Sequence, residues 1–184
     1  MKGKTAMKKG PVILLLSLVF VAGCIGQSQT GSTGYATEDV SRETGLERGF
    51  SAPPFQLEDV EQGDFTGDSL RGRPLFIFFT TTWCTPCQLG AKNLARYDAE
   101  TGDNAFNVLI VFVDPGEGEE KFRQWKLSFG RDDWYIAPDN GMAENYAVQY
   151  LDTKYVLDKE GIIKWKNLEI LAYERAKEVL NPLI

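Results

Sequence analysis

The chain of 184 residues contains no histidine, and it has only three cysteines, at positions 24, 84 and 87. A structural zinc site usually takes four ligands from cysteine and histidine. With no histidine and no second cysteine pair, the sequence argues against such a site. The chemistry that it does offer is concentrated in FFTTTWCTPCQLG, residues 78–90, where two residues separate Cys84 from Cys87.

A long apolar run is also lacking near the N-terminus. The stretch PVILLLSLVFVA is uncharged for 12 residues, whereas a membrane-spanning helix needs about 20. It follows MKGKTAMKKG, with its four lysines, and precedes GC. This order of charged, apolar and small residues is typical of a secretory signal peptide. The motif VAGC, residues 21–24, resembles the lipobox of prokaryotic lipoproteins, which implies cleavage after residue 23 and a lipid on Cys24. The alternative is an ordinary signal peptide with a chance cysteine.

Positive charge is scarce once residues 1–23 are removed. The remainder has 16 basic and 26 acidic residues, a net charge of −10. Nucleic-acid binding depends on clustered lysine and arginine side chains that contact phosphates, so we expect no nucleic-acid partner for this acidic chain. Anionic headgroups would repel such a protein, so membrane contact should come from the lipid on Cys24, where each buried methylene contributes about 0.8 kcal/mol. We therefore expect a lipid anchor to hold the protein at the extracytoplasmic face of a cell membrane.

The chain after the signal peptide divides into two parts. Residues 24–50 comprise the lipidated cysteine and a stretch rich in glycine, serine and threonine, which predicts a flexible tether. As a random coil, this tether spans roughly 25–30 Å. Residues 51–184 carry regular apolar patterns and are predicted to form one domain.

Strand and helix patterns alternate within residues 51–184. The runs 74–80 and 107–114 are apolar without polar alternation, which predicts strands covered on both faces. KYVLD and IIKWK flank the turn KEG and predict a hairpin. Helices are predicted after Cys84, over 118–129, over 141–148 and in the tail. The first has Cys87, Ala91, Leu94 and Ala95 on one face, and the last has Ala172, Ala176, Val179 and Leu180. Together these elements predict an α/β fold with a central mixed sheet flanked by helices.

Cys84 falls where a buried strand gives way to a helix. Unpaired N–H groups and the positive end of the helix dipole favour a thiolate there, with a pKa lowered from about 8.5 to between about 3.5 and 7.5. Pro86 fits the first helical turn, where its missing N–H costs nothing. Cys87 is then able to resolve a mixed disulfide formed at Cys84. A purely structural disulfide closing so short a loop would stabilise little. The pattern predicts a redox-active Cys84–Cys87 pair that uses no cofactor or metal.

Three segments resemble the TlpA-type thioredoxin-like proteins. LRGRPLFIFFTTTWCTPC is similar to their basic-proline step, apolar strand and W-C-x-x-C motif. SAPPFQLEDVEQGDFTGDSLRGRP is similar to their A-P-x-F-x-L lead-in, and YAVQYLDTKYVLDKEGII to their second landmark. The resemblance covers about residues 51–184. It implies a thioredoxin-like fold and an extracytoplasmic thiol-disulfide oxidoreductase that exchanges disulfides with protein substrates. For such an anchored protein we also expect a membrane redox partner.

The chain departs from this family at two positions and from related thioredoxins at a third. The family has a cis-proline facing the cysteine pair, where this sequence has Asp152. Its acidic residue three places after the second cysteine corresponds to Gly90, and the buried acid of related thioredoxins corresponds to Phe78. Both common proton acceptors are therefore missing. Asp152 is either a substitute that relays a proton to or from Cys87, or a solvent-facing loop residue without a role.

The residues just before the pair leave further interpretations open. Trp83 is interpreted as a packing residue, although an aromatic ring there could also shield the sulfur from water. TTWC, residues 81–84, also fits the T-x-x-C pattern of the peroxiredoxins, which implies a thiol peroxidase as one alternative function. A Cu(I)-binding or metallochaperone module is another, because a pair of thiolates suits this soft ion. Whether the pair acts as reductant or oxidant depends on the relative stability of its two states.

Overall fold

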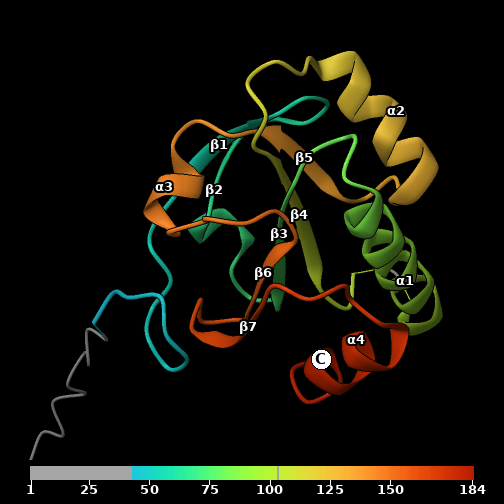
Figure 1. Ribbon diagram of the computed structural model, residues 1–184. Helices are drawn as coiled ribbons and strands as arrows, with labels where there is room; N and C mark the ends of the chain where they lie inside the picture. The colour runs from blue at the N-terminus through green and yellow to red at the C-terminus, as the bar shows by residue number, and fades with distance from the viewer. Residues whose placement is uncertain (1–42, 103) are drawn as a thin grey trace, which may run out of the picture. The chain divides into compact units, whose positions relative to one another are not determined.

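The computed structural model describes residues 43–102 and 104–184 (Figure 1). The main sheet contains β3 (Leu75–Thr80), β4 (Asn107–Phe112), β5 (Tyr135–Pro138), β6 (Thr153–Leu157) and β7 (Ile163–Asn167). Its strand order is β5-β4-β3-β6-β7. β3, β4 and β5 run parallel, and β6 is antiparallel to both β3 and β7. The predicted α/β fold with a central mixed sheet flanked by helices is thus confirmed.

Different elements cover the two faces of this sheet (Figure 1). The helices α1 (Thr85–Thr101), α2 (Glu119–Phe129) and α4 (Tyr173–Leu180) pack on one face. The hairpin of β1 (Gln56–Asp59) and β2 (Gly63–Thr66), the short η1 (Asp68–Leu70) and α3 (Met142–Asn145) pack on the other. Side chains alternate along a strand, so β3 sends Phe76 and Phe78 toward α1, and Ile77 and Phe79 toward the hairpin. Every residue of β3 and β4 is buried, as their apolar runs predict.

The observed elements differ from the predicted ones in three places. The hairpin β1–β2 and the strand β5 were not predicted, because each strand has only four residues and β1–β2 buries few side chains. In the tail, Ala176 and Leu180 are buried as predicted, but Ala172 is the exposed N-cap of α4. On α1, Ala95 is only partly buried, at the edge of the cluster that contains Cys87, Ala91 and Leu94.

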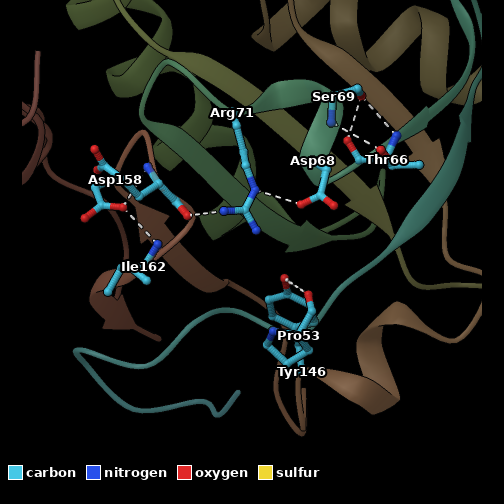
Figure 2. Close-up of polar contacts among 9 residues, drawn as sticks. Pro53, Thr66, Asp68, Ser69, Arg71, Tyr146, Asp158 and Ile162 are labelled. Carbon is cyan, nitrogen blue, oxygen red and sulfur yellow. Dashed lines mark hydrogen bonds and ion pairs between the residues drawn. The ribbon is translucent and has the colours of Figure 1, made fainter. Parts of the chain in front are cut away.

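The turn between β6 and β7 is tied to the segment before β3 (Figure 2). The carboxylate of Asp158 accepts hydrogen bonds from the backbone N–H groups of Glu160 and Ile162. Arg71 donates to the carbonyl of Glu160 and to the carboxylate of Asp68, the latter at 2.7 Å. These bonds hold one end of β6, the strand whose other end reaches the cysteine pair.

The predicted boundary of the tether at residue 50 is corrected by the structure. Residues 43–50 already belong to the fold, since the N–H of Gly49 donates to the carbonyl of Ile163 at 2.8 Å, and the N–H of Ile163 donates to the carbonyl of Phe50 at 2.9 Å. The edge strand β7 has backbone N–H and C=O groups that no other strand of the sheet pairs with. The polar segment 43–50 binds them through its own backbone, so its side chains gave no sign of this pairing. Residues 1–23, Cys24 and the tether up to residue 42 lie outside the described residues. Among the described residues, no helix has the length and apolar character needed to cross a membrane.

Candidate active site

Cys84 and Cys87 form a disulfide where β3 gives way to α1. Cys84 is the N-cap of α1, and its sulfur accepts a hydrogen bond from the N–H of Cys87 at 3.4 Å. Pro86 lies in the first turn, as predicted, and that turn contains no acidic side chain. The positive end of the helix dipole therefore acts on Cys84 without opposition from a carboxylate in its own turn.

The two sulfurs differ in access. The residue Cys84 is 6% exposed and lines a groove open to solvent, whereas Cys87 is fully buried among Phe78, Ala91 and other side chains under α1. An incoming thiol or disulfide reaches Cys84 first, and Cys87 lies behind it. This is the order of access needed for attack at one sulfur and resolution by the other.

Two carboxylates hold the loop that precedes the disulfide. Glu117, in the loop after β4, accepts hydrogen bonds from both the backbone N–H and the hydroxyl of Thr82. The indole N–H of Trp83 donates to Asp114 at 2.9 Å, and this bond, with one from the N–H of Gly116, lowers the pKa of Asp114. Trp83 is 60% exposed, so its interpretation as a packing residue is wrong. The ring stands beside Cys84 on the wall of the groove.

The groove beside the disulfide has a volume of about 660 Å³. Its floor and walls come from three segments: residues 83–86 at the start of α1, residues 151–152 before β6, and residues 168–170 after β7. The last segment is held against α1, because the side chain of Asn93 donates to the carbonyl of Leu171 and the buried Gly90 lets Leu171 approach closely. This brings the half-exposed Leu168 and Ile170 to the rim.

Asp152 lines the groove together with Cys84 but is itself only 5% exposed. Its φ of +68° is in the left-handed region, which turns the chain sharply before β6 begins. The carboxylate accepts a hydrogen bond from the Nζ of Lys154 at 2.6 Å, and the ammonium also donates to the backbone carbonyl of Asp152. The interpretation of Asp152 as a solvent-facing residue is therefore wrong. Asp152 is one half of a buried ion pair.

Burial moves both members of this pair toward their neutral forms. Desolvation raises the pKa of Asp152, although the hydrogen bond and charge of Lys154 act the other way. Desolvation lowers the pKa of Lys154, against the opposing effects of Asp152 and Glu169. A carboxyl group with a raised pKa is better matched to the exchange of a proton with a thiol than an ordinary aspartate is.

The prediction from sequence brought together most of this site and missed Lys154 and the rim. Cys84, Cys87, Trp83, Pro86 and Asp152 all lie within this one region. No pattern in the sequence indicates Lys154 as the partner of Asp152, because Asp152 precedes β6 and its left-handed φ breaks the alternation of a strand. The sequence held no signal for Leu168 and Ile170 either. Within the described ranges, no group of three or more metal-ligating side chains occurs.

Comparison with known proteins agrees with this geometry. Residues 49–166 match the model of the AhpC/TSA family. The thioredoxin-like protein YneN of Bacillus subtilis is 25% identical over 152 residues, which cover 83% of this chain and 84% of that protein. The thiol-disulfide oxidoreductase ResA of Bacillus thuringiensis subsp. konkukian is 26% identical over 183 residues, or 97% of each chain.

Solved structures share the fold at lower sequence identity. The thioredoxin domain of a thiol-disulfide oxidoreductase from Bacteroides vulgatus superimposes with a TM-score of 0.65 at 18% identity, covering 76% of this chain and 100% of that one. A thiol:disulfide interchange protein of the thioredoxin family from Chlorobium tepidum gives 0.65 at 16% identity, covering 74% and 97%. The expected thioredoxin-like fold is confirmed.

Proposed function

The chain belongs to the AhpC/TSA family of thioredoxin-like proteins, and we propose that it is a thiol-disulfide oxidoreductase acting on protein substrates at the outer face of a membrane. The observation that carries this proposal is the disulfide at the N-terminus of α1, with Cys84 on the wall of an apolar-rimmed groove and Cys87 buried behind it. The name of the relative ResA, a thiol-disulfide oxidoreductase, supports the same activity.

The proposed reaction is a two-step exchange that is reversible. In the reducing direction, the Cys84 thiolate attacks one sulfur of a substrate disulfide, whose S–S bond breaks and leaves a substrate thiolate. Cys87, as a thiolate, then attacks the sulfur of Cys84, which releases the second substrate thiolate and forms the Cys84–Cys87 disulfide. Two electrons pass to the substrate, and the two protons from Cys84 and Cys87 end on its thiols. No cofactor is needed beyond the cysteine pair.

Asp152 supplies the proton relay in this proposal. Asp152 lines the same groove as Cys84, and its raised pKa suits the uptake of a proton from Cys87 during the second step. Neither Gly90 nor Phe78, the two positions that hold acids in related proteins, has an ionisable side chain.

The location is proposed from the N-terminal sequence. The lysines, apolar stretch and VAGC motif of residues 1–24 support export and a lipid on Cys24, and the acidic remainder supports anchoring by the lipid rather than by surface charge. A protein anchored outside the cytoplasm has no direct access to cytosolic reductants. We therefore include a redox partner in the membrane, which returns the cysteine pair to its working state.

Trapping of mixed disulfides tests this function. The full chain carrying Cys24→Ser and Cys87→Ser is incubated with a disulfide-bonded protein such as insulin. The proposal predicts a covalent complex through Cys84 that dithiothreitol releases. The matched chain carrying Cys24→Ser and Cys84→Ser should form none. Equal trapping by both variants, or by neither, would contradict the assigned roles.

A thiol peroxidase is the second candidate, and one observation favours it. The hydroxyl of Thr81, in the T-x-x-C motif, is buried and has no hydrogen-bond partner among the described residues. In this chemistry the Cys84 thiolate attacks one oxygen of hydrogen peroxide, and the O–O bond breaks, which releases the other oxygen as hydroxide that takes up a proton to give water. The resulting sulfenic acid at Cys84 then condenses with the Cys87 thiol to give the disulfide and a second water. Consumption of hydrogen peroxide at a rate above that of disulfide exchange, and its loss in Thr81→Val, would favour this candidate.

A further inference from the structure

A lysine lies inside the sheet, directly under the helix that carries the redox pair. Lys154 is fully buried in β6, which lies between β3 and β7 in the sheet (Figure 1). It stands opposite Phe78 in the antiparallel register of β3 and β6. Directly opposed residues share a face of the sheet, and Phe78 packs in the same cluster as Cys84 and Cys87. Lys154 therefore lies on the face of the sheet that carries the cysteine pair, and not on the face that carries the hairpin.

The contacts of the ammonium fix its position. Its Nζ is 4.8 Å from the centre of the Phe78 ring. On its other side, it donates to the carboxylate and the carbonyl of Asp152, the residue that lines the groove with Cys84. The cation is thus held between a side chain of the cluster that contains Cys84 and Cys87 and a carboxylate at the edge of the groove.

Packing alone does not account for this arrangement. A buried ion pair loses the hydration of both charges, and replacing such a pair with apolar residues is often neutral or stabilising. The neighbouring residues on this face of β6 and β3, Val156 and Phe76, are apolar and fully buried. An apolar side chain at position 154 would therefore fit the pattern of the sheet better than lysine does.

We propose that Lys154 is a positioning residue for thiol-disulfide exchange: its ammonium, held by Asp152, stabilises the thiolate formed at Cys84 and so favours the reduced state of the pair. The inference rests on the proposed function and adds a residue to it. In low-dielectric surroundings the attraction between an ammonium and a thiolate is much stronger than in water. Asp152 moderates the effect, because its own charge opposes the thiolate.

Other charged groups surround the pair and set the background for this effect. Glu169 comes from the loop after β7 and lines the groove. Asp114 and Glu117 come from the loop after β4 and bind Trp83 and Thr82, and Lys121 on α2 acts on Asp114. Among the groups that these contacts place around the pair, Lys154 is the buried cation, and the three carboxylates all oppose a thiolate.

The movement of electrons and protons in the reduction step shows where Lys154 acts. A substrate dithiol gives two electrons, its two sulfurs join in a new S–S bond, and the Cys84–Cys87 bond breaks. Of the two protons that leave the substrate, one ends on Cys87. The other either protonates Cys84 or leaves for Asp152 or solvent, with Cys84 remaining a thiolate. The ammonium of Lys154 stabilises this second outcome.

The test compares Lys154→Met and Asp152→Asn in the full chain carrying Cys24→Ser, so that Cys84 and Cys87 are the only thiols. For each reduced protein, the ultraviolet absorbance of the thiolate is followed against pH, and the equilibrium with glutathione is measured. Lys154→Met should lower the acid dissociation constant of the Cys84 thiol by about tenfold. At a pH above the pKa of that thiol in both proteins, it should lower the equilibrium constant for reduction by the same factor, about 30 mV. Asp152→Asn should raise both severalfold.

The opposite signs separate an electrostatic role from a structural one. A merely structural ion pair would lose stability on either substitution and leave the thiolate titration unchanged. Lys166→Met is the matched control, because Lys166 is an exposed lysine on β7 whose ring partner Tyr155 lies on the other face of the sheet. We expect it to leave both measurements within twofold of the parent.

The other possible results separate a failure of the role of Lys154 from a failure of the proposed function. Titrations of Lys154→Met and Asp152→Asn that coincide with the parent, in a protein that still exchanges disulfides, overturn the role of Lys154 and leave the proposed function intact. A parent chain without a reversible thiol-disulfide equilibrium overturns both. If Lys154→Met does not fold, Asp152→Asn carries the test, and a lowered or unchanged thiolate fraction overturns the inference.

Discussion

The apolar rim of the groove gives the sharpest quantitative prediction about substrates. Leu168 and Ile170 are 45% and 50% exposed, although both are large apolar side chains. Full burial of such a side chain contributes about 1.5–3 kcal/mol, so a substrate that covers the exposed half gains about 0.7–1.5 kcal/mol from each. The double substitution Leu168→Ser with Ile170→Ser therefore removes about 1.5–3 kcal/mol of substrate binding.

This free energy converts directly into a rate. With a tenfold change for each 1.4 kcal/mol, kcat/KM for a protein substrate should fall by about 10- to 100-fold, part of the gain being offset by the cost of ordering the substrate. The assay measures reduction of insulin and, in parallel, exchange with dithiothreitol, which is too small to cover the rim. Only the first rate should fall.

A matched control comes from α2. Leu127 is 73% exposed and does not line the groove, so Leu127→Ser should leave both rates unchanged. An unchanged rate with insulin in the double variant would refute the assignment of the rim to substrate binding. An equal fall with dithiothreitol would show that the substitutions damage the cysteine pair itself.

Three further predictions concern other parts of the molecule. Trp134→Phe removes the buried hydrogen bond from the indole to Asp98, 2.7 Å long, and should lower the free energy of unfolding in urea by about 1–3 kcal/mol. Trp83→Phe should raise the pKa of Asp114 toward its ordinary 3.8, because the indole bond is the largest cause of the lowered pKa, and an NMR titration measures this. Stability gained from the lowered pKa is complete above 3.8 and is lost as the pH falls through the folded value. The variant should lose less stability over this range, since the bond from Gly116 remains. Cys24→Ser should abolish fatty-acid labelling and release the protein from membranes, whereas retained labelling would contradict the lipid anchor.

The sequence predicted the elements whose patterns are long and unambiguous. The apolar runs of β3 and β4 cannot be exposed along a surface, and the helix start at Cys84 follows from a strand end, a proline and the spacing of Cys87, Ala91 and Leu94. The strands β1, β2 and β5 have four residues each, too few for a period to show.

The site was harder to predict where tertiary contacts determine whether a side chain is buried or exposed. Trp83 is a large aromatic residue of the kind that usually packs in a core. Its indole N–H instead donates to Asp114, and the ring stays exposed. Asp152 and Lys154 are polar residues that commonly face solvent. The left-handed φ of Asp152, which no pattern in the sequence reveals, brings the two together inside the protein.

The proposed function requires Cys84 and Cys87 to form a reversible redox couple. The most direct measurement is a titration of the full chain carrying Cys24→Ser against defined glutathione buffers, with the thiols counted by alkylation. We expect one two-electron transition that Cys84→Ser abolishes, with a midpoint of about −270 mV for a reductant or about −120 mV for an oxidant. A folded chain that shows no reversible transition across these buffers would contradict the proposed function.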